Sequence, residues 1–290
     1  MRQLIVTGDD FGLAIPVNEA IEGAHRRGIL TTASLMVSAE AASDAIRRAQ
    51  VLPSLKVGLH LVLVEGRPVL PPSAVPDLVD AHGEFSTHLI RAGIKFFFYP
   101  RVRRQLQAEI RAQFDAFRRT GLALDHVNAH NHMHLHPTVL GLILKVGREY
   151  GLKAVRVPYE PFIPSWRMAR NAFFSRLAAS LLLFPWIILL KRRLGRASIR
   201  SNQFVFGLHD SGSMHLELVL RILKRLPQGV TEIYFHPATS RCPELIRTMP
   251  TYHHQSEFET LTHPHVREAL EATGAKTIAF SDLGEIAVCR

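Results

Sequence analysis

Residues 125–137 read DHVNAHNHMHLHP, a short strand-like segment that runs directly into four histidines at alternate positions. The apolar start of the chain, Leu4–Thr7, likewise runs into an acidic pair, Asp9 and Asp10. Imidazoles and carboxylates that arrive from the ends of separate strands are the ligands that a catalytic divalent metal needs. The pattern therefore predicts a metal site at one edge of a sheet.

Strand-like and helix-like segments alternate along most of the chain. The expected strands are 4–7, 31–37, 56–61, 126–129, 154–157, 204–206, 232–235 and 277–280. The expected helices are 17–27, 41–50, 102–119, 138–150, 215–226 and 264–273. Such βαβα alternation predicts an α/β fold with a mostly parallel sheet, rolled into a barrel.

Composition suits one catalytic domain over residues 1–290, because 47% of the residues are hydrophobic and 21% are charged. The first residues lack the basic region and long apolar core of a signal peptide, which favours a cytoplasmic protein. The two cysteines, Cys242 and Cys289, form no Cys-x-x-Cys pair, so a structural zinc site closed by cysteines is disfavoured.

The formal net charge of +10 is compatible with nucleic acid, anionic lipid or a solvated surface, and the positions of the charges decide among them. Arg101, Arg103 and Arg104 follow the apolar run 94–99. A second basic cluster follows the apolar run 181–190 and comprises Lys191, Arg192, Arg193, Arg196 and Arg200. Basic residues beside apolar and aromatic ones favour a membrane surface and argue against nucleic acid.

Candidate catalytic and metal-binding residues lie at the ends of four of the expected strands. Asp9 and Asp10 follow the first, His60 lies near the end of 56–61, His130 follows 126–129 and His236 follows 232–235. In parallel α/β folds the carboxyl ends of the strands carry the catalytic loops. We therefore expect these side chains to meet at one face.

Each motif also has a purely structural interpretation. Asp9-Asp10-Phe11-Gly12 could form a turn and helix cap, and an isolated His60 could be a hydrogen-bonded core histidine. His236 could cap a strand end, and Arg156 could form a surface ion pair. The alternate histidines 130, 132, 134 and 136 share one side only if the segment stays extended, and a solvated turn is the alternative.

Four motifs in this order resemble those of the YdjC-like (ChbG) carbohydrate deacetylases. They are residues 4–12, 57–61, 128–134 and 234–237. The resemblance implies a deformed (β/α) barrel of the polysaccharide-deacetylase type, with removal of acetyl groups from N-acetylated sugars.

The same resemblance implies roles for individual residues. Asp10, His60 and His130 would hold one divalent metal ion, Mg²⁺ or Zn²⁺. Asp9 would be the general base and His236 a candidate acid. Apart from the resemblance, His132 and His134 are candidates for contacts behind the metal or with the sugar, and Arg156 is a candidate for binding the substrate. The activity would be that of a hydrolase acting on a linear amide C–N bond.

Residues 162–200 depart from compact members of the family and form an apolar and basic insertion. Residues 177–190 carry no charge, but as a helix they would span about 21 Å, less than the roughly 30 Å hydrocarbon core, and Pro185 would break or kink them. We expect an interfacial or re-entrant helical element whose basic flank lies on lipid headgroups. A buried helical hairpin or an oligomer contact, such as a homodimer, is the alternative.

The chain looks like the hopanoid-biosynthesis branch (HpnK-like) of the family, which implies N-acetylglucosaminyl bacteriohopanetetrol as substrate and a peripheral position at the inner face of the cytoplasmic membrane. Soluble chitooligosaccharides are the alternative substrate. A metal-dependent phosphoesterase or amidohydrolase is a further alternative, although amidohydrolases usually begin with His-x-His where this chain has Asp9-Asp10. A noncatalytic peripheral membrane protein would explain the insertion but would not require Asp9.

Overall fold

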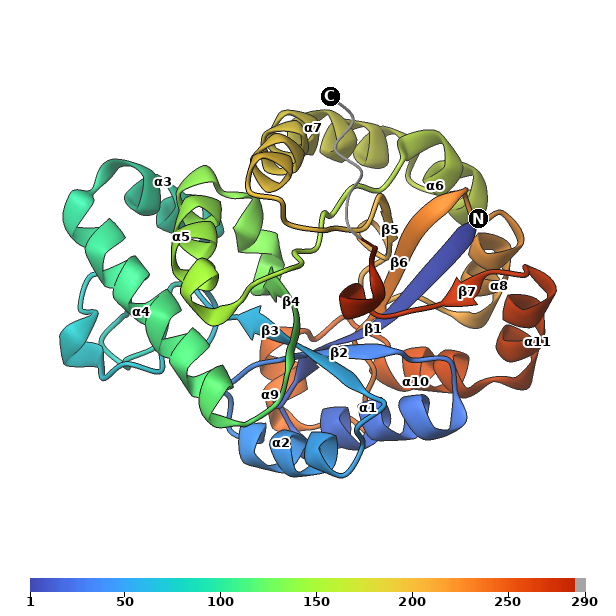
Figure 1. Cartoon of the computed structure of the whole chain (residues 1–290), viewed down its shortest axis with the longest axis horizontal. Coiled ribbons are helices and arrows are strands. Elements are labelled where there is room, and N and C mark those ends of the chain that lie inside the picture. The colour runs from blue at the N-terminus through green and yellow to red at the C-terminus, as the bar shows by residue number, and fades with distance from the viewer. Residues whose placement is uncertain (285–290) are drawn as a thin grey trace.

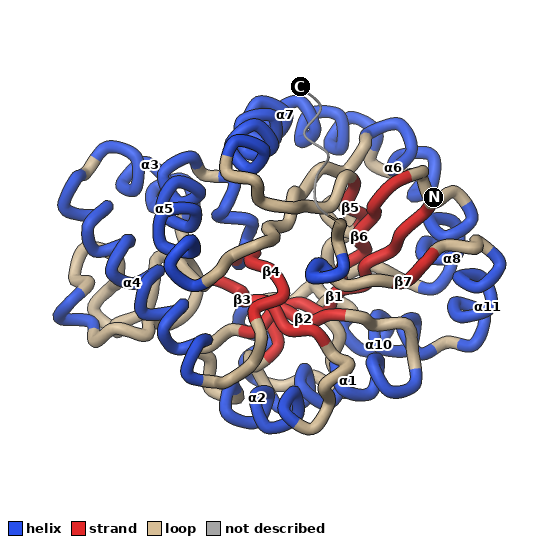
Figure 2. Tube along the Cα trace, in the orientation of Figure 1, coloured by secondary structure: helices blue, strands red, loops and turns tan. Residues whose placement is uncertain are grey.

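A computed structural model describes residues 1–284, so Cys289 and the end of the expected 1–290 domain lie outside the described residues. Seven parallel strands form one curled sheet, in the order β4-β3-β2-β1-β6-β5, with β7 also paired to β1. The strands are β1 Arg2–Phe11, β2 Thr32–Leu35, β3 Lys56–Leu61, β4 Leu124–Ala129, β5 Phe204–Phe206, β6 Gly229–Phe235 and β7 Lys276–Thr277. Helices surround this sheet on its outer side (Figures 1 and 2).

β1 lies at the centre of the sheet. It pairs with β6 from Arg2 to Gly8, with β2 towards its carboxyl end and with β7 at Gln3 and Leu4. Leu4, Ile5 and Val6 are fully buried, as expected for a parallel strand covered on both faces. This strand therefore delivers the acidic pair at its end into the interior of the protein.

The sheet approaches a closed barrel between β4 and β5. Isolated parallel bridges join Val127 to Val155 and Ala154 to Arg200, and the Val205 backbone N–H donates to the Tyr159 carbonyl at 2.9 Å. The predicted deformed barrel is confirmed. The predicted strand 154–157 is reduced to these bridges, and the predicted strand 277–280 ends at Thr277 before a short 3₁₀ turn.

Six of the helices correspond to predicted ones, with ends shifted by at most two residues. They are α1 Ile15–Arg27, α2 Ala42–Gln50, α4 Pro100–Arg119, α5 Pro137–Gly147 with the 3₁₀ turn η3 Arg148–Tyr150, α8 Leu216–Lys224 and α11 Pro264–Ala272. Pro100 and Pro137 start their helices at positions where a missing N–H costs no hydrogen bond. Gly151, with φ of 71°, ends the α5–η3 segment as expected.

The remaining helices come from loops and from the insertion. They are α3 Leu89–Phe98, α6 Phe162–Ala169, α7 Phe173–Arg196, α9 Pro243–Thr248 and α10 His254–Thr262, with 3₁₀ turns η1 Pro72–Ala74, η2 His130–Leu135 and η4 Phe280–Asp282. α7 continues through Pro185 for 24 residues, so a break at this proline is wrong, and the alternative of a kink stays a prediction. Phe174, Leu181 and Leu182 are 82%, 65% and 70% exposed, so the interpretation as a hairpin buried within the chain is also wrong.

Candidate metal centre and active-site cavity

The carboxyl ends of the strands surround a cavity of about 310 Å³. Its wall includes Asp9 from β1, His60 from β3, His130 and His132 after β4, and His236 after β6. The residues expected to meet at one face therefore do so. The volume is at the small end of the range usual for ligand sites, roughly 300–1,000 Å³.

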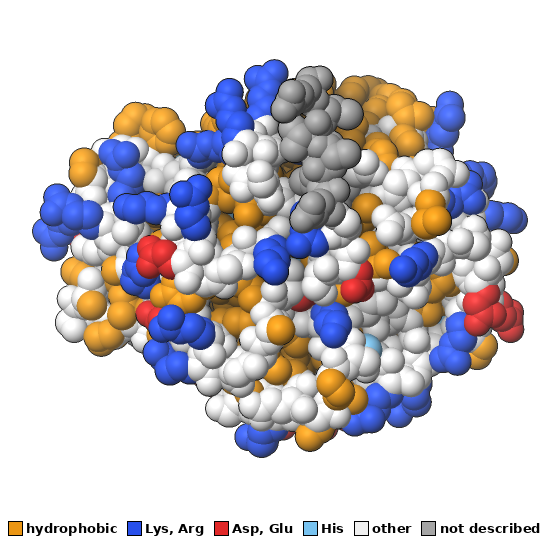
Figure 3. Space-filling model, viewed as in Figure 1, with side chains coloured by type: hydrophobic (Ala, Val, Ile, Leu, Met, Phe, Trp, Pro, Cys, Tyr) orange, Lys and Arg blue, Asp and Glu red, His pale blue; other side chains and the backbone are white. Residues whose placement is uncertain are grey.

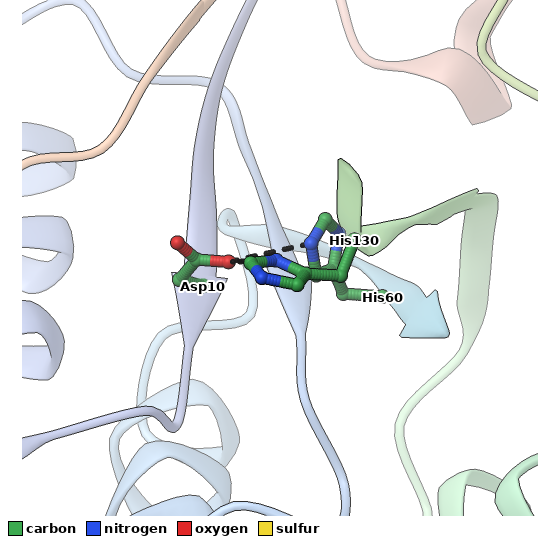
Figure 4. Close-up of side chains that lie close together, drawn as sticks. All are labelled: Asp10, His60 and His130. Atoms are coloured by element: carbon green, nitrogen blue, oxygen red, sulfur yellow. Dashed lines mark ion pairs between the residues drawn. The ribbon is translucent and has the colours of Figure 1, made fainter. Parts of the chain in front are cut away.

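Asp10, His60 and His130 form a cluster in which one ligand atom from each lies within 4.8 Å of the others. One carboxylate oxygen, Oδ1 of Asp10, faces both rings, at 3.3 Å from Nε2 of His60 and 3.4 Å from Nδ1 of His130 (Figure 4). Both carboxylate oxygens are buried without a hydrogen-bond donor among the described residues. A buried carboxylate left in this way is costly, and a cation in the cluster would satisfy it.

The backbone of Asp10 is held in an unusual conformation. Its φ is 61°, in the left-handed region that non-glycine residues seldom occupy, and strain of this kind concentrates at functional sites. Neither aspartate caps α1, whose N-cap is Ala14, so the helix-cap interpretation of this motif is wrong. The turn instead directs the Asp10 carboxylate towards the two histidines.

The outer nitrogen of each histidine faces an acceptor. Nδ1 of His60 lies 2.7 Å from Oδ1 of Asn128, and Nε2 of His130 lies 3.6 Å from a carboxylate oxygen of Glu65. A proton held on the outer nitrogen leaves the inner nitrogen as a free ligand, which is the usual arrangement behind metal-binding histidines. One carboxylate and two imidazoles with open positions between them therefore fit a catalytic divalent ion.

Asp9 is held by a buried ion-pair network. The guanidinium of Arg156 contacts both oxygens of Asp9, at 2.5 and 3.0 Å, and both oxygens of Glu232, at 2.7 to 3.0 Å. The hydroxyl of Thr7 donates to Glu232 at 2.6 Å. Burial alone would raise the pKa of Asp9, but the Arg156 charge outweighs it and holds that pKa far below its usual range. Asp9 is therefore ionised at neutral pH and can accept a proton.

Arg156 is fully buried behind Asp9. Its guanidinium is occupied by two carboxylates and stacks 4.6 Å from the centre of the Tyr234 ring. The ion pair is thus an interior one, and the interpretation as a surface pair is wrong. A direct contact between Arg156 and a substrate stays a prediction, and the observed contacts favour a role in positioning Asp9.

His236 lines the cavity and packs against two tyrosines, Tyr234 and Tyr252. Its backbone N–H donates to Glu257 at 2.5 Å. Burial lowers the pKa of His236 to about 4, although the nearby Asp10 and Asp9 oppose that shift. The imidazole is therefore neutral at neutral pH in the metal-free protein, and its assignment as an acid stays a prediction.

The alternate histidines do not form an extended ladder. The chain turns after β4 into η2, and Asn131 and His132 have φ of 51° and 52°. The expectation that all four share one side of an extended segment is therefore wrong, because two left-handed residues redirect the chain. The solvated turn is wrong as well, because His130 and His134 are buried.

Only part of this turn faces the cavity. His132 lines it and its Nε2 lies 3.1 Å from the Tyr234 hydroxyl, whereas burial lowers the pKa of His132 to about 3. His134 is fully buried and lies outside the cavity wall, so no sugar contact is available to it in this conformation. His136 packs against Phe96 and Phe97 of α3.

Sequence reasoning missed three polar residues of the site. Asn128 lies inside a quoted motif, and its place beside the histidines was a usable signal. Glu232 precedes the motif at 234–237 by two residues, which is the strand period that puts it on the side of Tyr234. Glu65 lies in a loop with no motif, and that loop is held by Glu109 of α4, which accepts from the backbone of Val69 and Leu70.

Comparison with known proteins gives consistent results along nearly the whole chain. Residues 3–272 match the model of a family described as YdjC-like protein. Carbohydrate deacetylases from Brevibacillus brevis and Geobacillus stearothermophilus are 32% and 36% identical, over 97% of this chain and 100% and 98% of their own lengths. A solved structure from Enterococcus faecalis V583, named for cellobiose-phosphate cleavage, has a TM-score of 0.74 at 26% identity, covering 96% of this chain and 97% of its own.

Proposed function

We propose a function from the premise that this chain belongs to the YdjC-like protein family, whose relatives described above are named carbohydrate deacetylases. The chain is a metal-dependent hydrolase that cleaves the amide C–N bond of an N-acetylglucosamine unit and releases acetate. One observation carries this proposal. The Asp10 carboxylate lies buried between two imidazoles, with no other polar partner among the described residues, and next to an ionised Asp9 that lines the cavity.

Asp10, His60 and His130 would hold one divalent ion, which when bound polarises the amide carbonyl and makes a water easier to deprotonate. Imidazole ligands suit Zn²⁺, and a carboxylate with open positions also suits Mg²⁺. The ligand nitrogens are Nε2 of His60 and Nδ1 of His130, because these are the nitrogens that face Asp10.

The protein supplies the proton transfers. Asp9, oriented by Arg156 and by the Asn128 amide at 3.2 Å, accepts the proton of the attacking water as general base. His236 gives a proton to the leaving sugar amine. Because the imidazole of His236 is neutral at neutral pH, it must receive that proton during turnover. Asp9, on the same cavity wall, is the group that takes up a proton, from the attacking water.

The substrate is a sugar carried on a hopanoid lipid, N-acetylglucosaminyl bacteriohopanetetrol, which becomes the glucosaminyl product. The cavity of about 310 Å³ suits one sugar unit and leaves the hydrocarbon outside it. Within residues 1–284, α7 is the one helix long and apolar enough to cross a membrane, and only 17% of its most apolar window is buried. Figure 3 shows hydrophobic side chains and Lys and Arg side chains near one another along the edge of the protein where Figure 1 places α7.

Helix α7 is attached to the rim of the cavity. Arg176 of α7 forms a buried ion pair with Asp210, and Ser180 lies 3.4 Å from His209. Both partners belong to the loop 207–213, whose Leu208 and Ser211 line the cavity. On the other side of the rim, Leu89 of α3 lines the cavity, and the next residue, Ile90, is 83% exposed. Exposed apolar helices thus adjoin the opening on two sides.

These features support a peripheral enzyme in the cytoplasm, at the inner face of the membrane, with α7 lying in the interface. Two alternatives have specific support. The relatives are named only for carbohydrates, which favours a soluble chitooligosaccharide as substrate. The exposed face of α7 could instead cover the same face of a second copy, or serve a noncatalytic protein on the membrane.

Acetate release tests the proposal. The metal-loaded protein is given N-acetylglucosaminyl bacteriohopanetetrol in detergent or N,N′-diacetylchitobiose, with Asp9→Asn as control. We expect release from the lipid and at least a hundredfold less with the variant, as for loss of a general base. Release of acetate from chitobiose alone would refute the lipid as substrate. Release from neither compound, with metal bound, would refute the deacetylase activity. Size-exclusion chromatography reports whether a dimer forms.

A further inference from the structure

A chain of buried polar side chains lies behind the metal centre, and among its members only Asn128 takes part in the steps above. It runs from Asp125 and His126 of β4, through Ser34 of β2, to Asn128 of β4, and these four residues are at most 3% exposed. Buried polar groups are costly unless every donor and acceptor is paired, so the pairing within this chain is informative.

The first half of the chain has a fixed direction. Asp125 accepts from the backbone N–H of Ser281 at 2.8 Å and from the Thr32 hydroxyl at 3.1 Å. Nδ1 of His126 lies 2.9 Å from the same carboxylate and must donate to it, because a carboxylate only accepts. With its proton on Nδ1, the neutral His126 ring presents Nε2 as an acceptor, 3.1 Å from the Ser34 hydroxyl.

The directions of the remaining hydrogen bonds in the chain follow from Ser34. Its one proton goes to His126, since no other acceptor for it is found among residues 1–284, and its oxygen accepts from Nδ2 of Asn128 at 3.0 Å. The second hydrogen of Nδ2 goes to Oδ1 of Asp9 at 3.2 Å. The amide oxygen of Asn128 then accepts from Nδ1 of His60 at 2.7 Å. The opposite amide orientation would set that oxygen against the Asp9 carboxylate.

We propose that Asp125, His126 and Ser34 are positioning residues that fix the amide orientation of Asn128, and through it both the tautomer of His60 and the direction of the Asp9 carboxylate. A proton on Nδ1 of His60 leaves Nε2 free towards Asp10, which is the form that can bind a metal ion. The inference rests on the proposed function for what His60 and Asp9 do, whereas the tautomer of His60 can be observed without any reaction.

Packing holds the His126 ring in a slot. Phe280 stacks on one side, with ring centres 4.4 Å apart and an interplanar angle of 25°. On the other side lies Gly58, where an added Cβ would come within 2.4 Å of the ring. The ring cannot move aside or exchange its hydrogen-bond partners without a change in the sheet, so Ser34 always receives an acceptor nitrogen in the same place.

Two variants separate the two ends of the chain. Ser34→Ala removes the acceptor for Asn128, so both the His60 tautomer and the Asp9 contact should be affected. Asn128→Asp keeps an acceptor for His60 but cannot donate to Asp9 or to Ser34, so the Asp9 contact is lost while the His60 contact is kept. Thr231→Val is the matched control, because Thr231 is equally buried on β6 and its hydroxyl has no partner among the described residues.

The first readout is the nitrogen NMR spectrum of ¹⁵N-histidine-labelled, metal-free protein, together with Zn²⁺ affinity and melting temperature. The wild type and Asn128→Asp should show His60 protonated at Nδ1, and Ser34→Ala should add a minor second tautomer, because Asp9 alone then opposes the reversed amide. Zn²⁺ affinity should fall about tenfold to a hundredfold in Ser34→Ala, as for other groups behind metal ligands, and be unchanged in Thr231→Val.

The second readout is kinetic, with acetate release from whichever substrate the wild type accepts. Both chain variants should lose kcat by about tenfold or more with KM within twofold of the wild type, whereas Thr231→Val should change neither. A His60 signal in Ser34→Ala identical to that of the wild type would overturn the inference. If Ser34→Ala shows the tautomer shift but the wild-type protein hydrolyses no substrate, the proposed function is overturned and the inference about the positioning residues stands.

Discussion

At the metal centre, carboxylates and imidazoles are buried, whereas along helix α7 leucine and phenylalanine side chains face outward. Asp9 and Asp10 are 2% and 1% exposed, while Phe174 and Leu182 are 82% and 70% exposed. Both regions reverse the usual distribution, in which charged residues lie outside and large apolar ones inside. In the proposed function, each reversal is explained by a component from outside the chain, a cation in one case and an apolar phase in the other.

The two regions should be separable in function although they adjoin. The loop 207–213 links them, because α7 holds it by the Arg176–Asp210 pair and its other side lines the cavity. Changes at the metal centre should therefore abolish turnover of every substrate. Changes on the exposed face of α7 should affect only a substrate that is carried in a membrane.

The largest effect is expected at the metal centre. Asp10→Ala should lose the metal and activity together, by about a thousandfold or more, because metal catalysis is worth several kcal/mol. Asp9→Asn should retain the metal and lose about a hundredfold to ten-thousandfold, the usual contribution of a general base. Metal content by mass spectrometry and acetate release on both variants check this, and reversed behaviour of the two would contradict the assignment.

A smaller effect is expected on α7. Phe174→Ser, Leu181→Ser and Leu182→Ser combined should weaken sedimentation with anionic vesicles by about a hundredfold, since partial burial of each side chain in the interface contributes about 1 kcal/mol, less than the roughly 1.5–3 kcal/mol of full burial. Turnover of a soluble substrate should be unchanged. Val51→Ser with Ile246→Ser is the matched control, because both residues are exposed and apolar but lie outside α7. Equal loss with the control would remove the distinction between the two regions.

The protonation of His130 in the metal centre can be tested by varying the pH. Burial would lower the pKa of His130, but Asp10 and Glu65 outweigh it and raise the pKa to about 9 in the metal-free protein. The stability that this proton gives the metal-free fold is complete below the ordinary value of about 6.5 and is lost as pH rises through about 9. The proton must leave before the metal binds, so Zn²⁺ affinity should rise about tenfold per pH unit from pH 7 to 8.

Calorimetry in two buffers of different ionisation enthalpy measures the proton released, and we expect about one per ion bound at pH 7. Glu65→Gln removes one of the two carboxylates that hold the proton, so the affinity should level off at a lower pH in this variant. An affinity independent of pH would mean that His130 is not a ligand.

The smallest effect is expected at the basic flank of α7. Arg192 and Arg196 are exposed, and each cation near an anionic surface is worth about 1 kcal/mol, or roughly a fivefold change in vesicle affinity. Each single variant, Arg192→Gln or Arg196→Gln, should therefore weaken vesicle binding about fivefold, and this loss should disappear at high salt. Vesicle sedimentation at two salt concentrations measures this. Binding unaffected at low salt would show that α7 docks through its apolar face alone.

Elements with a clear period and clear ends could be predicted from the sequence. β5 was predicted at its observed ends, and α1, α4 and α11 within two residues, because apolar spacing and starting prolines are local signals. The sequence analysis does not predict α3, whose apolar residues stand there only as a run before a basic cluster. The turn at η2 was missed because two left-handed residues, one of them a histidine, have no strong signal in sequence.

The sequence by itself determined which side chains end the strands, and so brought Asp9, Asp10, His60, His130 and His236 to one face. Tertiary structure alone decided what those side chains can do. Asp9 meets Arg156 across 147 residues, Thr7 meets Glu232 across 225, and His60 meets Asn128 across 68. Contacts of this kind exist only after the sheet has curled. The depth of burial, which makes His236 neutral, and the Arg156 charge, which keeps the buried Asp9 ionised, are likewise properties of the packed interior and of no single segment.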